Sequence, residues 1–251
     1  MHRRDALKLF AGLALCPLCA PTGFAADSHW SYEGAAGPGK WGSLDAANAV
    51  CSTGQQQSPI DISSPISARQ PPLDIRWTRR PDTIVNNGHT IQLDFAGGST
   101  LHVGQRSYEL RQFHFHHPSE HQVDGKGFAM EAHFVHAARA GGGLAVVGVF
   151  IAPGKANRVF NKIVSTIPAE QGPPVPADRA IDPNGLLPAE RAYYRYEGSL
   201  TTPPCSETVE WLVLAHRIEV AKADIERFAR LYPMNARPVQ DRERRFILTS
   251  G

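Results

Sequence analysis

Two histidines at alternate positions, His114 and His116, are the residues of this sequence best suited by spacing to bind a metal. They lie in the run Gln112-Phe113-His114-Phe115-His116, which is typical of a β-strand. Side chains alternate between the two faces of a strand, so both imidazoles project from one face while Phe113 and Phe115 project from the other. Imidazole nitrogens are common ligands of Zn²⁺. The pair alone does not establish a metal site, because histidines without a metal are also common in strands.

A third imidazole comes from the next predicted strand, in the run Glu131-Ala132-His133-Phe134-Val135-His136. Alternation places Glu131 and His133 on one face and His136 on the other. If the two strands are neighbours in a sheet, His133 joins the pair. Three neutral imidazoles leave the zinc its double positive charge and an open position for water. The ligating rings need acceptors that fix their tautomers, and Gln112 and Glu131 lie on the correct faces to provide them.

Two further segments carry groups that could direct a metal-bound hydroxide. Ser119-Glu120-His121 follows the histidine pair closely and contributes a carboxylate, and the loop Gly198-Ser199-Leu200-Thr201-Thr202-Pro203-Pro204-Cys205 contributes hydroxyl groups. A threonine hydroxyl that donates its hydrogen bond to Glu120 must accept one from the hydroxide. This arrangement would aim a lone pair of the hydroxide oxygen at the substrate. Without the other residues, the loop would be interpreted as a tight turn.

The first 26 residues have the pattern of an export signal that is absent from the mature protein. Paired Arg3 and Arg4 precede an apolar stretch over residues 7–20, and small residues near position 26 offer a cleavage site. The paired arginines resemble a twin-arginine signal, and an ordinary Sec leader is the alternative. Either route leads out of the cytoplasm, which predicts a periplasmic protein.

Removal of this leader changes the charge balance and the cysteine count. The chain has 26 basic and 24 acidic residues, and 23 of each remain after residue 26, so no excess positive charge indicates nucleic-acid binding. No apolar run after the leader is long enough to cross a membrane. Two cysteines remain, Cys51 and Cys205. In an oxidising compartment this pair most simply forms one disulfide, and two unpaired buried thiols are the alternative.

Short strand patterns separated by turn residues predict one domain over residues 27–251, mainly β (α+β) in class. The predicted strands cover residues 83–85, 89–95, 99–103, 108–117, 128–136, 144–151, 191–197 and 208–216. Helices are expected near 157–165 and 223–231, and the proline-rich stretch 168–188 is interpreted as a long surface loop. We therefore expect one large, twisted, mostly antiparallel sheet with short peripheral helices.

Taken together, these segments resemble the α-class carbonic anhydrases, in particular their exported bacterial members. The resemblance extends from about residue 28 to residue 247, and several blocks follow the family's order and spacing. The matching blocks are residues 30–32, 57–62, 86–89, 112–116, 119–121, 131–136, 144–150 and 199–204. The resemblance implies a conical active-site cleft and the reversible hydration of carbon dioxide to bicarbonate and a proton.

The resemblance also implies a zinc site and groups that act on its water. Zn²⁺ would be bound by His114, His116 and His133. Carbonic anhydrase is itself the standard example of zinc lowering the pKa of bound water to about 7. Thr201, together with Glu120, would orient the zinc-bound hydroxide.

Further roles around the zinc follow from the same resemblance. Thr202 would lie beside the substrate. His89 matches the family's proton shuttle, for which an imidazole is suitable because its unperturbed pKa is about 6.5; a plain turn residue is the alternative. The remaining roles are an apolar wall around carbon dioxide (Val146, Leu200, Trp211), a water network (Tyr32, Asn87) and a disulfide (Cys51, Cys205).

Three other histidines and one charged segment fall outside this set of roles. His117 and His136 follow the ligand strands on the opposite face, and His121 is expected to be a structural hydrogen-bonding residue. The segment 241–245, Asp-Arg-Glu-Arg-Arg, is more charged than the family pattern. This difference leaves the ligands intact and puts the local contacts of the segment in doubt.

Two alternatives compete with the enzyme. The spacing of His114, His116 and Glu120 also fits part of a cupin motif, in which Glu120 would bind iron or manganese. Tyr108 stands where that motif has glycine, and no second motif follows. A non-catalytic relative would be expected to lack ligand histidines, whereas all three are present. The sequence therefore favours an exported zinc enzyme acting on carbon dioxide and bicarbonate. A homodimer is an open expectation, although no patch in the sequence indicates an interface.

Overall fold

One large sheet forms the centre of this computed structural model, which describes residues 30–139 and 141–251. The leader expected over residues 1–26 lies outside the described residues. The strands are β1 (Asp61–Ile62), β2 (Ile66–Ser67), β3 (Leu73–Arg76), β4 (Thr83–Asn86), β5 (Ile91–Asp94), β6 (Thr100–Val103), β7 (Arg106–His116), β8 (Gln122–Val123), β9 (Met130–Ala138), β10 (Leu144–Pro153), β11 (Val175–Pro176), β12 (Tyr193–Gly198), β13 (Val209–Leu214), β14 (Ile218–Val220) and β15 (Leu248–Thr249). The helices are α1 (Trp41–Leu44), α2 (Val50–Thr53), α3 (Arg158–Thr166) and α4 (Lys222–Ala229), and the 3-10 turns are η1 (Gly34–Ala36), η2 (Pro38–Lys40), η3 (Ala46–Asn48) and η4 (Pro183–Leu186).

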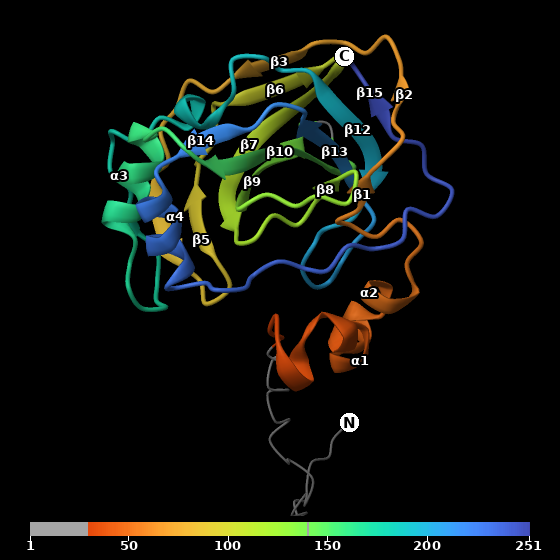
Figure 1. The fold of residues 1–251 in the computed structure, drawn as a ribbon, viewed down its shortest axis with the longest axis horizontal. Coiled ribbons are helices and arrows are strands. Elements are labelled where there is room, and N and C mark those ends of the chain that lie inside the picture. The colour runs from red at the N-terminus through yellow and green to blue at the C-terminus, as the bar shows by residue number, and fades with distance from the viewer. Residues whose placement is uncertain (1–29, 140) are drawn as a thin grey trace, which may run out of the picture.

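The main sheet has 13 strands and is strongly twisted (Figure 1). Its order is β11-β4-β5-β7-β9-β10-β13-β12-β15-β2, with β6 pairing β3 and β7 and with β14 beside β10. Most neighbours are antiparallel, while β10 pairs in parallel with β13 and with β14, and β15 pairs in parallel with β2. The predicted mainly β class and mostly antiparallel sheet are confirmed.

The predicted strands and helices correspond to observed elements with small shifts at their ends, but the prediction for residues 168–188 was wrong in part. This stretch contains β11, which pairs with β4, and the turn η4. Ile181 and Leu186 within it are fully buried in the main core. Prolines exclude long regular elements from the stretch but do not prevent its apolar side chains from being buried.

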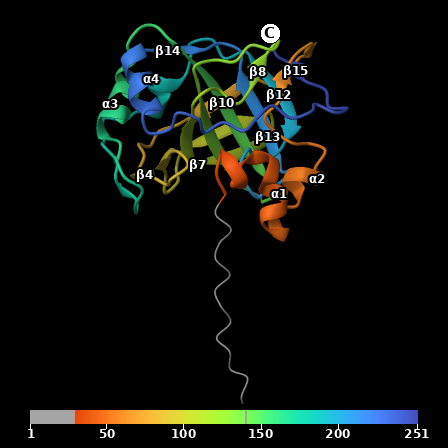
Figure 2. The same ribbon diagram turned by 60° about the horizontal axis from the view of Figure 1, so that its bottom comes forward.

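Alternation along the strands divides the sheet into two faces with different contents. On one face Phe113, Phe115 and Phe134 are fully buried in the larger core. The helices α3 and α4 lie side by side on this flank (Figure 2). Phe160 of α3 and Phe228 of α4 pack edge-on against Phe115. Burial of each such side chain stabilises the fold by roughly 1.5–3 kcal/mol. The opposite face holds a smaller apolar cluster together with His114, His116 and His133.

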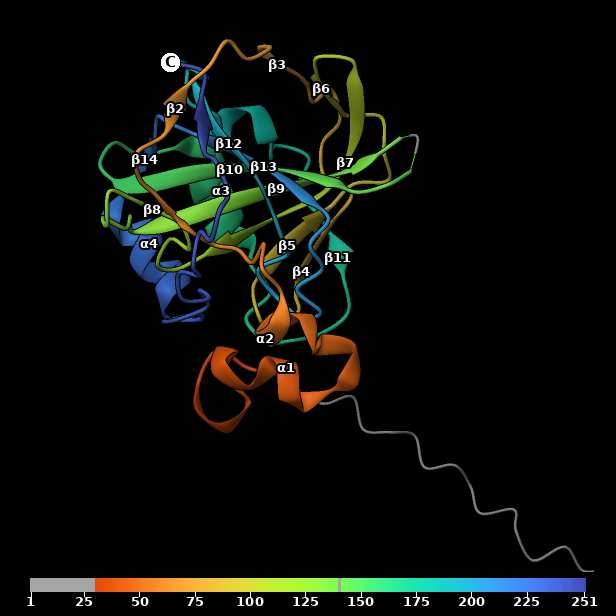
Figure 3. The ribbon, with the colours of Figure 1, turned by 90° about the vertical axis from the view of Figure 1, so that its right-hand side faces the viewer.

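The N-terminal segment with α1 and α2 packs at one end of the sheet (Figure 3). The predicted disulfide is confirmed, since Cys51 of α2 is bonded to Cys205, with an S–S distance of 2.04 Å. Trp41 is fully buried beside this disulfide, with Trp30 and Tyr32 packed against it. The disulfide therefore attaches an otherwise irregular segment to the loop after β12. Within the described ranges, no helix is long and apolar enough to span a membrane.

Candidate metal centre

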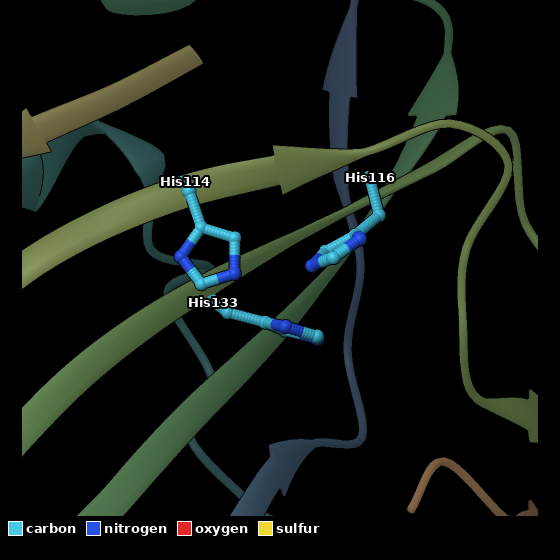
Figure 4. A group of neighbouring side chains, drawn as sticks. All are labelled: His114, His116 and His133. Atoms are coloured by element: carbon cyan, nitrogen blue, oxygen red, sulfur yellow. The ribbon is translucent and has the colours of Figure 1, made fainter. Parts of the chain in front are cut away.

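The register between β7 and β9 brings the three predicted ligand histidines together (Figure 4). His114 pairs directly with His133 across the two antiparallel strands, and His116 pairs with Glu131. One ring nitrogen from each of the three histidines lies within 4.8 Å of the other two. Because every side chain on this face must alternate with one on the core face, the packed phenylalanines hold the histidines in register.

Each of the three rings is oriented by a hydrogen bond on its outer nitrogen. Nδ1 of His114 is 2.8 Å from Oε1 of Gln112, and Nε2 of His133 is 2.9 Å from Oε1 of Glu131. Nδ1 of His116 is 2.7 Å from the main-chain oxygen of Asn235. An acceptor on one ring nitrogen holds the proton there and leaves the other nitrogen with a lone pair. The nitrogens that face the centre of the cluster are therefore Nε2 of His114, Nε2 of His116 and Nδ1 of His133.

The electrostatics of the three histidines suit a metal ion. Burial lowers the pKa of His116 to about 4 and also lowers the pKa of His114 and of His133, so all three rings are neutral at pH 7. Nε2 of His116 is buried and has no hydrogen-bond partner anywhere in residues 30–139 and 141–251. An orphaned buried acceptor facing two further imidazoles fits a divalent cation. The three imidazole nitrogens therefore fit a divalent metal ion.

Glu131 connects this cluster to His121. Its Oε1 is 2.8 Å from Nδ1 of His121, and its Oε2 accepts from the main-chain nitrogens of Glu120 and His121. Burial opposes ionisation, yet His121 and His133 hold the pKa of Glu131 well below its usual range. Nε2 of His121 is 2.6 Å from the hydroxyl of Tyr196, so His121 has the structural hydrogen-bonding role that the sequence predicted. The grouping of His121 with Glu131 and His133 is thus a hydrogen-bonded cluster rather than an independent cation site.

A glycine opposite His133 makes room for the Glu131 carboxylate. Gly148 of β10 pairs directly with His133. A Cβ atom at Gly148 would lie 3.1 Å from Oε1 of Glu131. Any larger residue would press on the carboxylate that orients the His133 ring.

Glu120 is buried beside two of the ligand rings, with its oxygens 3.5 Å from Nδ1 of His116 and 3.8 Å from Nδ1 of His133. Its Oε1 accepts a 2.8 Å hydrogen bond from the main-chain nitrogen of Arg237. Burial raises the pKa of Glu120 to about 7, and this rise is limited by His133, by the Arg237 nitrogen and by the nearby Thr201 side chain. Thr201 and Glu120, which are 81 positions apart in the sequence, are therefore close in the structure.

The loop that carries Thr201 is fixed at both ends. The Ser199 hydroxyl accepts from the Ser58 nitrogen at 2.9 Å, and the Ser58 hydroxyl accepts from the Ser199 nitrogen at 3.1 Å. At the other end, Cys205 carries the disulfide and its nitrogen donates to the Thr202 oxygen at 2.9 Å. Thr201 is buried and Thr202 is half-buried between these anchors.

The apolar residues predicted to line the site form one cluster beside His133. Val146 and Trp211 are buried in the smaller apolar cluster of the sheet, and the half-buried Leu200 packs against it. The Trp211 ring lies 4.8 Å from the His133 ring, and Nε1 of Trp211 donates to the Ser199 oxygen at 3.0 Å. The conical shape of the cleft stays a prediction.

His89 lies half-buried on the turn between β4 and β5. Oδ1 of Asn87 accepts from the main-chain nitrogens of His89 and Thr90, each at 2.9 Å, so the Asn87 side chain shapes the turn. The His89 ring stacks on Trp30, with centroids 3.7 Å apart. Tyr32 packs edge-on against Trp30, and burial with the nearby Glu120 raises the pKa of Tyr32 well above its usual range.

Arg237 is a residue of this site that the sequence reasoning missed. Its buried guanidinium donates to Oε1 of Gln57 and to the main-chain oxygens of Ser58 and Cys51, at 2.8–3.0 Å. Burial lowers the pKa of Arg237 to about 10, so the group remains charged at pH 7. It thereby joins the N-terminal segment to the main-chain nitrogen that holds Glu120. These contacts bridge about 180 positions in the chain, and no spacing pattern signals them.

The charged segment 241–245 has a structural part in the same region. Arg245 donates to the main-chain oxygen of Gln57 at 2.8 Å and to that of Glu197 at 3.2 Å. Its guanidinium carbon lies 5.6 Å from the centre of the Tyr196 ring. The segment therefore supports Tyr196, which in turn contacts His121.

These features define a mainly β protein with a cluster of three histidines that is consistent with a metal site. The family model for eukaryotic-type carbonic anhydrase matches residues 36–251. A carbonic anhydrase of Pectobacterium atrosepticum is 39% identical over 226 residues, which cover 89% of this chain and 92% of the relative. The α-carbonic anhydrase of Thermovibrio ammonificans, solved with the inhibitor sulfanilamide, is 42% identical with a TM-score of 0.85, covering 88% of this chain and 98% of that one.

A carbonic anhydrase of Neisseria gonorrhoeae is also similar, being 41% identical over 92% of this chain and 94% of the relative. The protein therefore belongs to the α-class, eukaryotic-type carbonic anhydrase family. This membership excludes the cupin alternative.

Proposed function

We propose that this protein catalyses the reversible hydration of carbon dioxide to bicarbonate and a proton, with Zn²⁺ held by His114, His116 and His133. The observation that carries the proposal is the donor set itself, which consists of three neutral imidazoles whose inner nitrogens converge. One of these nitrogens, Nε2 of His116, is buried and has no hydrogen-bond partner in the part of the chain that the structure describes. A zinc ion held there would supply a Lewis acid that ionises its water near neutral pH. Family membership supports the reaction.

Thr201 and Glu120 give the attack its direction. Glu120 would accept the hydrogen bond of the Thr201 hydroxyl, which would leave the Thr201 oxygen to accept one from the nucleophile. The nearby Thr201 side chain limits the rise in the pKa of Glu120, which supports this pairing. The main-chain nitrogen of Arg237 holds Oε1 of the Glu120 carboxylate. A nucleophile held in this way keeps its lone pair aimed at the carbon of carbon dioxide, so that less orientational entropy is lost at the reaction step.

Carbon dioxide would be held by the apolar wall of Val146, Leu200 and Trp211, with Thr202 beside it. An apolar substrate without charge has no strong hydrogen-bonding group for recognition, so a dry surface next to the nucleophile is the suitable binding site. The burial of Val146 and Trp211 supports this role.

His89 would transfer the released proton between the site and bulk buffer, with Tyr32 and Asn87 in the connecting water network. The half-buried position of His89 at a turn supports a group that exchanges protons with solvent. The position of Tyr32 near Glu120 supports a place on the inner side of this network.

We further propose that the mature protein is the single domain of residues 27–251, exported to the periplasm by a twin-arginine or Sec signal. The Cys51–Cys205 disulfide supports an oxidising compartment. A homodimer is also proposed, and sedimentation equilibrium of the mature protein would test it.

The competing function is a non-catalytic binding protein that keeps the fold. Metal analysis of the purified protein, followed by a carbon dioxide hydration assay with and without a sulfonamide, separates the two functions. The enzyme predicts one zinc per chain and hydration that the sulfonamide inhibits. Protein fully loaded with zinc but without hydration activity would overturn the proposal.

A further inference from the structure

We propose that the segment from Tyr232 to Asn235, which follows α4, is a positioning element that holds the turn bearing His89 at a fixed place relative to the ligand strand β7. This inference rests on the shuttle role proposed for His89. In this inference, the side chains of Tyr232 and Asn235 affect proton transfer indirectly. They position His89 and do not contact the reacting atoms.

Tyr232 reaches both ends of the turn through one hydroxyl group. The hydroxyl donates to Oδ1 of Asn86, and it lies 3.3 Å from the main-chain oxygen of Thr90. Its ring is 8% exposed and packs against Phe228 of α4, which fixes the height of the hydroxyl above the turn. Burial raises the pKa of Tyr232 to about 12, so the donor keeps its proton at neutral pH.

Asn235 connects the turn directly to the strand of the metal ligands. Its fully buried amide nitrogen donates to the main-chain oxygen of His89 at 3.0 Å and to that of Phe115 at 2.9 Å. Its Oδ1 accepts from the His117 nitrogen at 2.7 Å. Its own main-chain oxygen is the group that orients His116. One residue therefore contacts both the shuttle's backbone and a ligand's ring.

The turn is held by its own hydrogen bonds, made by the Asn86 and Asn87 side chains, and by contacts from outside it. Gly88 at its tip has φ = 86°, a conformation that favours glycine, and Gly88 donates to Asn86 through a long 3.2 Å bond. The Thr90 hydroxyl also ties the end of the turn to the Phe115 oxygen, at 2.5 Å. On the outer side, the Asn86 amide donates to the Pro168 oxygen at 3.1 Å. The Tyr232–Asn235 segment is thus one of several contacts that hold the turn from outside, and it connects the turn to Phe228 of α4.

A shift of this turn would affect one step of the reaction only. Proton transfer through bridging waters depends steeply on distance, and a 1 Å misplacement of a catalytic group can cost about 100-fold in rate. The hydration step itself uses groups on other loops and strands. Loss of the support should therefore lower kcat where proton export limits turnover and leave kcat/KM unchanged.

The test compares Tyr232→Phe with Tyr193→Phe, both as the full zinc-loaded protein. Tyr193 is a matched control, because it is also a buried tyrosine whose hydroxyl makes a main-chain hydrogen bond, to Pro71 at 2.7 Å, in another part of the sheet. In weak buffer, we expect Tyr232→Phe to lower kcat by roughly three- to tenfold, short of the 100-fold that a full 1 Å shift can cost. Added imidazole should restore kcat, while Tyr193→Phe should keep the wild-type kcat.

His89→Ala serves as the reference that separates the inference from the shuttle role itself. If His89→Ala lowers kcat in weak buffer and Tyr232→Phe does not, the positioning role is wrong and the shuttle stands. If Tyr232→Phe lowers kcat and kcat/KM together, the effect is general damage and the inference also fails. Unchanged turnover in His89→Ala would overturn the shuttle and the inference with it.

Asn235→Ala provides a second arm with a different readout. This variant removes the amide that holds His89 but keeps the main-chain oxygen that orients His116. We expect zinc content to stay at one ion per chain while kcat in weak buffer falls and is restored by imidazole. Folded, zinc-loaded Asn235→Ala with wild-type kcat in weak buffer would contradict the proposal.

Discussion

The ligand histidines and the groups proposed to direct the reaction are held by different kinds of structure. His114, His116 and His133 stand on β7 and β9, where the hydrogen bonds between paired strands fix their spacing. Thr201 and His89 stand on loops, which are held by a disulfide, by buried polar side chains and by segments remote in sequence. The spacing of the three ligand histidines therefore depends on the rigid sheet. The positions of Thr201 and His89 depend instead on the contacts of their loops.

The largest effect should come from removing a histidine of the strand-built part of the site, which consists of His114, His116 and His133 on β7 and β9. His133→Ala removes one of three donors, so we expect loss of zinc together with activity. The loss of activity should exceed the 10- to 100-fold that removal of an outer hydrogen-bond partner costs. Metal analysis and a hydration assay measure both. His102→Ala, a histidine of β6 outside the cluster, is the control and should keep its zinc. Zinc retained at one ion per chain in His133→Ala would contradict the ligand assignment.

The loop-built part of the site consists of the loops that carry Thr201 and His89. The support of the Thr201 loop can be weakened without changing the ligand histidines. The double variant Cys51→Ser/Cys205→Ser should lower the free energy of unfolding by about 2–5 kcal/mol, since the disulfide joins residues separated by 154 positions. Denaturant unfolding would give this value. Zinc content should be unchanged, because no ligand lies on either joined segment. A fall in zinc content in the folded variant would show that the two parts are not independent.

Thr201→Val changes the residue of the loop-built part that is proposed to orient the nucleophile. Valine has nearly the same shape but cannot donate to Glu120. We expect kcat/KM to fall about 100-fold with zinc retained, as for the loss of one well-placed hydrogen-bonding group in an active site. Adding Glu120→Gln should cost little more, because the two residues act as a unit. Fully additive losses would argue against the shared hydrogen bond.

The smallest effect concerns His136, which lies on the same strand as His133 but on the opposite face. Trp77 donates to its Nε2 at 3.0 Å, and burial lowers its pKa to about 4. The unfolded chain, with an ordinary pKa near 6.5, then binds more protons, so stability is lost as pH falls from about 6.5 towards 4. Between pH 7.5 and 5 this loss is about 2 kcal/mol. His136→Gln should reduce this pH dependence, and an unchanged slope in denaturant titrations would contradict it.

The strand-built part is also the part that the sequence predicts best. Alternation places His114 and His116 on one face of their strand and Phe113 and Phe115 on the other, and it places His133 on the same face as Glu131, because a period of two residues is a local property of the chain. The pairing of β7 with β9, which brings His133 to the other two histidines, was a condition of the prediction and is confirmed by the register of the two strands.

The supports of the loops could not be predicted in this way. Asn235 and Arg237 act on residues more than 100 positions away, through main-chain atoms that carry no residue-specific signal. Buried Ile181 and Leu186 were missed for a similar reason, since prolines around them hide the apolar pattern. The choice of Thr201, rather than Thr202, as the partner of Glu120 came from the family resemblance.

The spacing of the ligands along the chain has a consequence for the order of folding. All three lie within residues 114–133, on strands that follow one another closely and pair antiparallel. Closing so short a loop costs little chain entropy, whereas the parallel pairing of β10 with β13 must wait for a long crossover. We expect the β7–β9 pair to form early and to offer a zinc ion its first contacts before the rest of the sheet closes. Pulse-labelled hydrogen exchange in which β12 and β13 are protected ahead of β7 and β9 would contradict this order.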